Sequence, residues 1–388
     1  MWLLPPRTDV RQRQGFQYFS SRRISGGMVQ LKAEPPGPDN NKYLPSMNPT
    51  LKPFQQIAAG TALLVAVSSF AAFGEETGST NTAPKGLAQQ IFDTMLQVHG
   101  TTAGHRPVHA KGIVCEGTFT PSAAAAALSK AAHFQGAVVP VTVRLSDGAP
   151  DPLISDNSPN AGPRGMAIRF KLPGGDETDI VALSHNGFAV GNGEEFLALQ
   201  KAVVATDPSK PHPWPIEEFL TTHPATLKFV QESSVVPTSF ATEAFFGNDA
   251  FVFVNKDGVK QAGRYQIIPV AGRHDLDEAG AKAKPANFLI DDLKTRLAAG
   301  PVQFRLVVQL PNAGDPTKDP SLVWPDDRKT VEMGTITLNA VDADSVAAEK
   351  ALAFDPVNLT DGIELSDDTL PVLRSKVYAL AVLYRNPE

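Results

Sequence analysis

The residues best suited to chemistry lie on the segment RSKVYALAVLYR near the end of the chain. Arg374 and Tyr378 are four residues apart and Arg385 follows seven later, so on a helix the three side chains share one face. A guanidinium one turn from a phenol stabilises the phenolate, a hard anionic oxygen ligand suited to ferric iron, including haem iron. Tyr384 falls off this face, which makes Tyr378 the candidate iron ligand. By itself, such an Arg–Tyr pair is more often a hydrogen-bond and packing motif.

A second set of polar residues borders an expected strand. In RPVHAKG, His109 alternates with apolar Val108 and can point into a cavity as a proton-transfer group. In VRLSDG, Arg144 and Ser146 alternate with Leu145 and therefore share one face of a strand. A serine beside a histidine is also a hydrolase pattern, but no GxSxG nucleophile elbow surrounds Ser146. Since a single histidine is more often structural, this set alone defines no function.

The hydrophobic pattern predicts the elements that would position these side chains. Apolar residues at helical intervals predict helices, and short β-branched or aromatic segments between Gly, Pro and Asp turns predict strands. The expected strands are 112–120, 138–145, 166–172, 179–181, 251–255, 265–271 and 302–310, and the expected helices are 86–99, 194–204, 216–230 with an interruption at Pro224, 286–299 and 367–383. This order indicates an α+β fold built on an antiparallel sheet or barrel, in one domain over 86–388.

The first 75 residues differ from the rest in composition. Residues 1–46 show no clear hydrophobic period and form a poorly defined leader, which is disordered or precedes the true start codon. Residues 47–75 resemble a signal peptide or membrane anchor, because 57–73 is an uncharged apolar run behind an excess of basic residues. We therefore expect an exported, periplasmic protein, with membrane attachment through 57–73 if the segment is not cleaved. A buried helix is the alternative for this run.

Composition limits the kinds of partner and site. The net charge is −6 and no basic block interrupts the body of the chain, which argues against nucleic acid as a partner. Cys115 is the one cysteine, so no intramolecular disulfide can form, and no Cys/His cluster exists for a zinc or iron–sulfur site. A lone cysteine in an apolar strand is usually core filler, with a thiolate nucleophile or haem ligand as the alternatives.

Taken in order, the motifs resemble those of the haem catalases. RPVHAKG followed by GTF, then VRLSDG, PRGMAIRF, DIVALSHNGF and NLTDGIELSDDTLPVLRSKVY match that family's motif series from about residue 90 to the C-terminus. The resemblance implies a catalase-like antiparallel β-barrel with inserted helices and a C-terminal helix that carries the haem ligand. It also implies haem b as the cofactor and a peroxide as the substrate.

The resemblance carries a role to each matching residue. His109 matches the distal histidine that moves the peroxide proton, and Ser146 matches the hydroxyl that orients the peroxide. Tyr378 matches the proximal iron ligand, and Arg374 matches the arginine that keeps it ionised. In the family, the other matching residues lie beside the haem. Arg106 and Arg144 match arginines near its propionates, Arg385 matches an arginine on the ligand helix, and Phe188 matches a phenylalanine stacked on the haem. Among the remaining histidines, only His185 near Phe188 is a further candidate.

Two departures from the catalases point to one branch of the family. Where catalases present a distal asparagine, alignment from Asp179 places Leu183, and Asn186 lies three residues further on. The sequence also continues for only ten residues after Tyr378. It does not show the long C-terminal region that is associated with NADPH in typical catalases. Both features resemble the small catalase-related peroxidases. We therefore expect a haem peroxidase that reduces hydrogen peroxide or organic hydroperoxides with an organic electron donor, with weak catalase activity at most.

Other functions stay open at this point. An allene-oxide-synthase-like hydroperoxide isomerase would rearrange fatty-acid hydroperoxides without an external donor, and the apolar Leu183 is compatible with it, whereas His109 beside Ser146 favours peroxide cleavage. A non-enzymatic haem-binding protein would oxidise donors no faster than free haemin. A barrel without haem would require the five ordered motifs to be coincidental. The electron donor and the oligomeric state are open.

Overall fold

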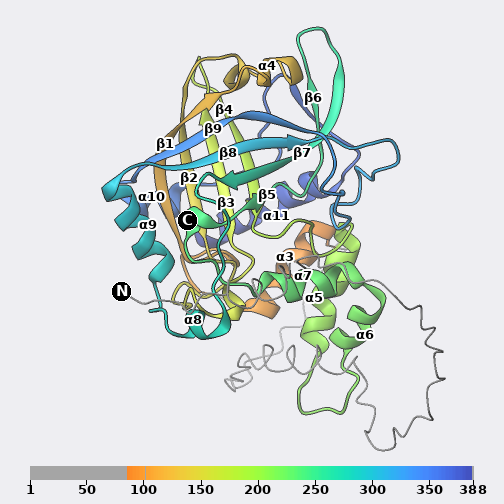
Figure 1. Ribbon diagram of the computed structural model, residues 1–388. Helices are drawn as coiled ribbons and strands as arrows, with labels where there is room; N and C mark the ends of the chain where they lie inside the picture. Colours follow the sequence, from red (N-terminus) through yellow and green to blue (C-terminus); the bar gives the residue numbers. More distant parts are fainter. Residues whose placement is uncertain (1–84, 101, 387–388) are drawn as a thin grey trace, which may run out of the picture. The chain divides into compact units, whose positions relative to one another are not determined.

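The computed structural model describes residues 85–100 and 102–386, which lie within one compact unit (Figure 1). The leader expected over 1–46 and the signal peptide or anchor expected over 47–75 lie outside the described residues. Within the described ranges, no helix combines the length and the apolar character needed to cross a membrane.

Eight antiparallel strands close into a barrel, which confirms the predicted α+β fold. Around the barrel the order is β1-β2-β3-β4-β5-β7-β8-β9, and β9 pairs back with β1. Two short strands, β6 and β10, extend the sheet beyond β7. The bounds are β1 (Gly112–Pro121), β2 (Val139–Ser146), β3 (Gly165–Lys171), β4 (Glu177–Leu183), β5 (Phe245–Phe246), β6 (Phe251–Val254), β7 (Lys260–Pro269), β8 (Val302–Gln309), β9 (Thr330–Val341) and β10 (Ile363–Leu365).

Alternation along the strands separates the barrel interior from the face that carries chemistry. In β2, Val143 and Leu145 belong to the main apolar core, whereas Arg144 and Ser146 project from the opposite face. Aromatic side chains complete the interior, as where the rings of Phe119 and Phe170 meet edge to face at 5.3 Å. Because the interior is filled, any site must lie on the outer face of the wall.

Helices cover the outer face and one end of the barrel (Figure 1). At that end, α3, α5, α6 and α7 gather, and α3 packs against both α5 and α11 through an apolar cluster that includes Ile91, Leu197 and Val377. On another side, α9 packs against β9. The bounds are α3 (Leu87–His99), α4 (Ala125–Leu128), α5 (Gly193–Ala205), α6 (Pro215–Thr222), α7 (Pro224–Ser233), α8 (Glu278–Lys282), α9 (Phe288–Ala299), α10 (Ser345–Ala351) and α11 (Leu370–Arg385).

Local chemistry sets the helix ends. The Asn192 side chain accepts a hydrogen bond from the backbone N–H of Glu195 at 2.9 Å and so caps α5. Pro224 begins α7, which confirms the predicted interruption after α6, because proline suits the first turn of a helix but not its interior. The helix expected from 367 begins at Leu370, whose N–H donates to the Asp368 carboxylate at 2.9 Å.

Cys115 is core filler, as its apolar strand context predicts. It is fully buried within the main core, and burial raises the pKa of its thiol to about 12. A thiol in this state is neither an effective nucleophile nor a ready metal ligand.

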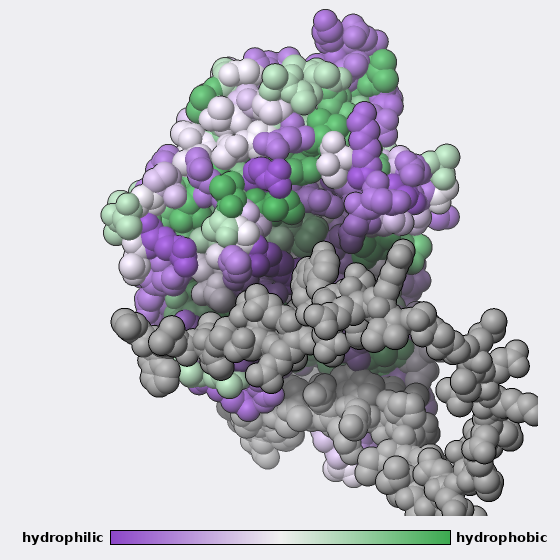
Figure 2. Space-filling view, viewed as in Figure 1, coloured by the Kyte–Doolittle hydropathy of each residue, from purple (hydrophilic) through white to green (hydrophobic). Residues whose placement is uncertain are grey.

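The surface of the described residues is mixed in hydropathy. On the face shown in Figure 2, hydrophilic residues are interspersed with smaller hydrophobic areas.

Strand β1 changes register against β9 at a bulge between Glu116 and Gly117. A Cβ added at Gly117 would lie 2.2 Å from the backbone oxygen of Thr337, so the two strands approach too closely for any side chain at this position. The bulge therefore depends on glycine, and through it the closure of the barrel does too.

We expect Gly117→Ala to lower the free energy of unfolding by about 2 kcal/mol, the usual cost of overpacking a filled site. Urea unfolding followed by circular dichroism measures this change. Gly300→Ala is the matched control, because no atom lies within 4 Å of a Cβ built there. Equal losses in the two variants would contradict a special role for the bulge.

Candidate active site

Helix α11 places Arg374 and Tyr378 on one face, as their spacing predicts. The Arg374 guanidinium donates to the Tyr378 phenol oxygen from Nη2 at 3.0 Å and from Nε at 3.3 Å, and its Nη1 donates to the Asp249 carboxylate. Burial by itself lowers the pKa of Arg374, but the Asp249 carboxylate and Tyr378 together raise that pKa above its ordinary value. A permanent positive charge therefore lies against the phenol.

His109 and Ser146 also meet, which confirms their predicted proximity. Nδ1 of His109 lies 3.2 Å from the Ser146 hydroxyl oxygen. Among the described residues, His109 is the only non-glycine with a positive φ, at 55°. Its N–H donates to the Gly148 carbonyl at 3.1 Å, and its own carbonyl accepts from Arg144 Nη2 at 2.7 Å. These two bonds hold the residue in a backbone conformation that costs about 1–3 kcal/mol, as strain at functional positions often does.

The His109 ring is uncharged at neutral pH. Burial, together with the positive charges of Arg144, Arg106 and Arg374, lowers its pKa to about 3. Val108 and Val377, the sequence neighbours of His109 and Tyr378, pack in the same apolar cluster. The two predicted halves of the site therefore belong to one site.

Beside His109, paired strands present a row of residues on one face of the sheet. Across the sheet, Ser146 pairs with Gly165, Gly165 with Leu183 and Leu183 with Phe246, so all four residues present the same face. A Cβ added at Gly165 would lie 2.9 Å from the Ser146 hydroxyl and 3.0 Å from His109 Nδ1. Glycine therefore leaves the His–Ser pair intact and keeps this part of the wall flat.

Two of the three predicted arginines pair with one carboxylate, and the third shares a backbone carbonyl with one of them. Arg106 and Arg144 form ion pairs with Glu349 of α10, both at 2.8 Å. Arg385 donates to the carbonyl of Leu352, which also accepts from Arg106. Glu349 offsets one of these three charges, so the cluster keeps an excess of two positive charges and suits a ligand with two carboxylates.

Burial and mutual repulsion lower the pKa values of two of these arginines. For Arg106, burial together with the Arg144 charge lowers the pKa to about 9. For Arg385, too, burial comes first and Arg144 second in lowering the pKa. Both guanidiniums would be stabilised by an additional anion.

Phe188 lies at the margin of the site. Its ring centre is 5.6 Å from that of Phe196, which packs in the cluster that contains Val108 and Val377, the neighbours of His109 and Tyr378. The stacking role predicted for Phe188 stays a prediction.

His185 has structural partners on both ring nitrogens. Nδ1 lies 2.8 Å from the Gly187 carbonyl, and Nε2 lies 3.1 Å from the Glu232 carboxylate. These contacts join the segment after β4 to α7 and leave His185 without a free nitrogen for chemistry.

Comparison with known proteins now identifies the family. The family model described as Catalase matches residues 75–387. A catalase-related peroxidase of Mycolicibacterium paratuberculosis is 36% identical over 299 residues, which cover 76% of this chain and 94% of that protein. Another, from Synechococcus elongatus, is 32% identical over 333 residues, which cover 84% of this chain and 95% of that protein.

A solved fungal catalase shares the fold, with a TM-score of 0.62 and 20% sequence identity. The match covers 72% of this chain and 59% of the fungal chain. The chain therefore belongs to the catalase family, on its branch of catalase-related peroxidases.

Catalase-family proteins bind haem, and the residues of this site fit such a group. Tyr378 supplies an anionic oxygen ligand of a kind that haem iron accepts. The arginine cluster matches two propionates in charge. Gly165 adds no side chain beside His109 and Ser146, and Gly112 leaves room for the Arg144–Glu349 pair, since a Cβ there would lie 2.5 Å from Arg144 Nη2 and 2.7 Å from Glu349 Oε1. The site thus has a candidate iron ligand, positive charges for the two propionates and a glycine that leaves space beside His109.

Sequence reasoning missed three residues of the site: Asp249, Glu349 and Gly165. Asp249 and Glu349 reach the site from segments far along the chain, and no local spacing connects an acid to a distant arginine. Gly165 is inside the motif PRGMAIRF. A glycine directly before an apolar segment was the available signal that other side chains approach the backbone closely there.

We expect Tyr378→Phe to weaken haemin binding strongly and to change the visible absorption spectrum, because it removes the candidate iron ligand. Haemin titration of the purified protein followed by absorbance measures both effects. Tyr384→Phe is the matched control on the same helix, since Tyr384 packs edge to face on Phe92 at 5.9 Å within the apolar cluster. Equal haemin affinity and identical spectra in wild type and Tyr378→Phe would exclude Tyr378 as the ligand.

Proposed function

We propose that the protein is a haem b peroxidase that reduces hydrogen peroxide or organic hydroperoxides with an organic electron donor, with weak catalase activity at most. The observation that carries the proposal is the pairing, in one site, of a neutral His109 held by Ser146 with a Tyr378 held by Arg374. The names of the relatives, both catalase-related peroxidases, support the same reaction class.

Each part of the site has a task in this proposal. Tyr378 holds the haem iron, and Arg106, Arg144 and Arg385 bind the propionates. When bound, the haem supplies the iron that binds peroxide and carries out its redox chemistry. With Nδ1 beside Ser146, His109 offers Nε2 to accept the peroxide proton and return it to the departing oxygen, as a general acid–base group does. A pKa near 3 keeps that nitrogen unprotonated throughout the neutral range.

Leu183 supports peroxidase over catalase activity. It stands where the resemblance places the distal asparagine of catalases, and it shares the face of Gly165 and Ser146. An isobutyl group donates no hydrogen bond, so a second peroxide molecule gains no polar contact there. An organic donor then has more opportunity to supply the electrons.

A hydroperoxide isomerase is the second candidate, because the same apolar Leu183 suits a lipid hydroperoxide. Incubating a fatty-acid hydroperoxide with and without a phenolic donor separates the two functions. An isomerase converts it equally well in both, whereas a peroxidase requires the donor. Export to the periplasm is a further proposal, supported by the composition of residues 47–75.

We expect His109→Ala to keep haem but to lose at least about 10²-fold in the rate of peroxide-dependent donor oxidation, the usual effect of removing a general acid–base group. Stopped-flow absorbance measures the rate, and added imidazole should restore part of it. The control is His274→Ala, because His274 is exposed and away from the site. Unchanged activity in the first variant would remove His109 from the mechanism.

We expect Leu183→Asn to raise oxygen release from hydrogen peroxide about tenfold, because one hydrogen bond of ~1.4 kcal/mol to the reacting peroxide corresponds to that factor. An oxygen electrode measures the release, and Leu183→Met is the control of similar volume without a donor. If Leu183→Asn behaves like Leu183→Met, the side chain at this position does not decide between the two activities.

A further inference from the structure

A second row of charged residues lies directly behind the His–Ser pair. Ser146 is in register with a glycine of β1 and a glycine of β3, and each member of this row has a charged neighbour in the chain. Because neighbouring residues of an extended chain point to opposite sides, the charged side chains lie behind the site rather than in it. All three are buried, and the proposed reaction does not use them: Lys111, Asp147 and Arg164.

Asp147 is the centre of this second row. Its carboxylate lies 3.6 Å from Nε of Arg164 and 4.0 Å from Nζ of Lys111. Both separations are longer than a hydrogen bond, and among the described residues neither Oδ1 of Asp147 nor Nε of Arg164 has a hydrogen-bond partner. Asp156 supplies a further negative charge, because it pairs with Lys111 and its carbonyl accepts from Arg164 at 2.8 Å. Asp147 is therefore held to the two cations by charge.

The turn that begins with Asp147 helps to set the backbone of His109. The N–H of Asp147 donates to the Lys111 carbonyl at 3.1 Å, and the next carbonyl, that of Gly148, accepts the hydrogen bond from the His109 N–H. The turn is closely packed, since a Cβ at Gly148 would lie 2.4 Å from the Pro163 oxygen. A shift of Asp147 against its neighbours would therefore move the carbonyl that holds His109 at its positive φ.

We propose that Asp147 is a positioning residue for His109, and that its negative charge acts by drawing Lys111 and Arg164 together behind the turn at Gly148. When the carboxyl group is neutral, the two cations lose the negative charge between them and repel each other across the turn. The inference rests on the proposed function, in which His109 moves the peroxide proton.

The charge of Asp147 changes near neutral pH. Burial, opposed by the charge of Arg164 and assisted by that of Asp156, raises the pKa of Asp147 to about 8. His109 does not titrate in this range, because its own pKa is about 3. The charged groups that face Asp147, together with the acids that act on Arg164 in turn, are Lys111, Arg164, Asp156, Glu243 and Asp275.

We expect the rate of peroxide-dependent donor oxidation by the haem-loaded protein to rise roughly tenfold between about pH 6 and about pH 9, because charging Asp147 restores the position of His109. The midpoint should lie near the pKa of Asp147, about 8. Asp147→Asn has a similar shape but no charge, so it should keep the low rate over the whole range. Stopped-flow absorbance measures the rates, with a donor that does not titrate in this range.

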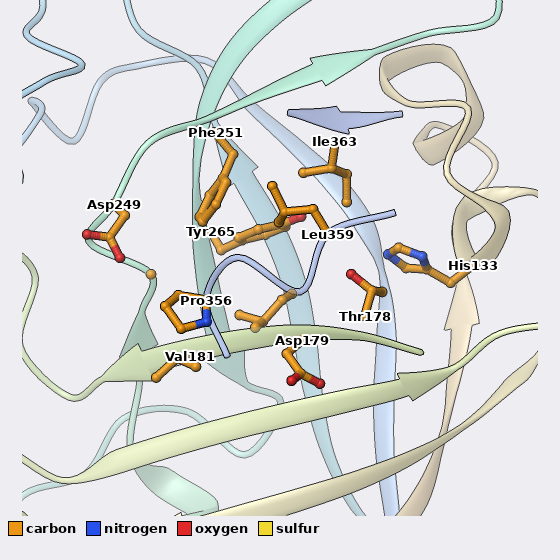
Figure 3. A pocket seen from close by; sticks show the side chains of 12 residues that line it. His133, Thr178, Asp179, Val181, Asp249, Phe251, Tyr265, Pro356, Leu359 and Ile363 are labelled. Atoms are coloured by element: carbon orange, nitrogen blue, oxygen red, sulfur yellow. The ribbon is translucent and has the colours of Figure 1, made fainter. Parts of the chain in front are cut away.

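Asp179→Asn is the matched control, because it removes another buried acid of the same sheet. Asp179 pairs with Arg169 at 2.8 Å, four residues along β4 from Leu183, and borders the small cavity shown in Figure 3. This variant should keep the wild-type midpoint, since the charge of Asp147 is unchanged.

Stability gives a second measurement that needs no haem. Because the pKa of Asp147 in the folded state is raised, the folded protein keeps a proton that the unfolded chain releases. The free energy of unfolding of wild type should therefore fall relative to that of Asp147→Asn as the pH rises from about 4 to about 8. Urea unfolding followed by circular dichroism measures this difference, and a constant difference over the range would contradict a titrating Asp147.

The outcomes separate this inference from the proposed function. If the wild-type rate does not change with pH over this range, or if Asp147→Asn keeps the wild-type midpoint, the inference is wrong and the function stands. If Asp179→Asn loses the midpoint as Asp147→Asn does, the effect is not specific to Asp147 and the inference is again wrong. Donor oxidation that is as fast in His109→Ala as in wild type overturns the proposed function and the inference with it.

Discussion

The architecture of this site follows from how a closed β-barrel distributes its side chains. Alternate residues must fill the interior, so polar groups on the same strands are left on the outer face. There, Arg144 pairs with Glu349 of α10, and α11 carries the candidate iron ligand Tyr378. Once the helices exclude water, each charge needs a partner, and the ion pairs of the site are the result.

Positive side chains outnumber negative ones in the site. Four arginines surround it, while the acids that contact them, Glu349 and Asp249, are fewer. Burial, together with this positive field, keeps the His109 ring neutral. In the proposed function, the same field would also favour binding of the anionic propionates of the cofactor.

Much of this arrangement was predictable from sequence because it is local. The helix with Arg374 and Tyr378, the strand with Arg144 and Ser146 and most strands of the barrel carry their periodicity within a few residues. Strand β9 was missed, since its alternation is interrupted by Gly334 and its partners β1 and β8 are set by closure of the barrel. The acids of the site were missed for a related reason: Glu349 meets Arg106 across 243 positions of sequence, and only the folded chain connects them.

Helix α11 combines two duties that are usually separate. One side packs with α3 and α5 through Val377, and another carries Tyr378, so the helix that would anchor the cofactor in the proposed function also closes the apolar cluster at the end of the barrel. Anything that binds Tyr378 in the native state therefore also stabilises this cluster, in proportion to the logarithm of ligand concentration over Kd. In the proposed function, cofactor supply would therefore reduce how often the C-terminal helix opens, and with it the exposure of the chain to proteolysis.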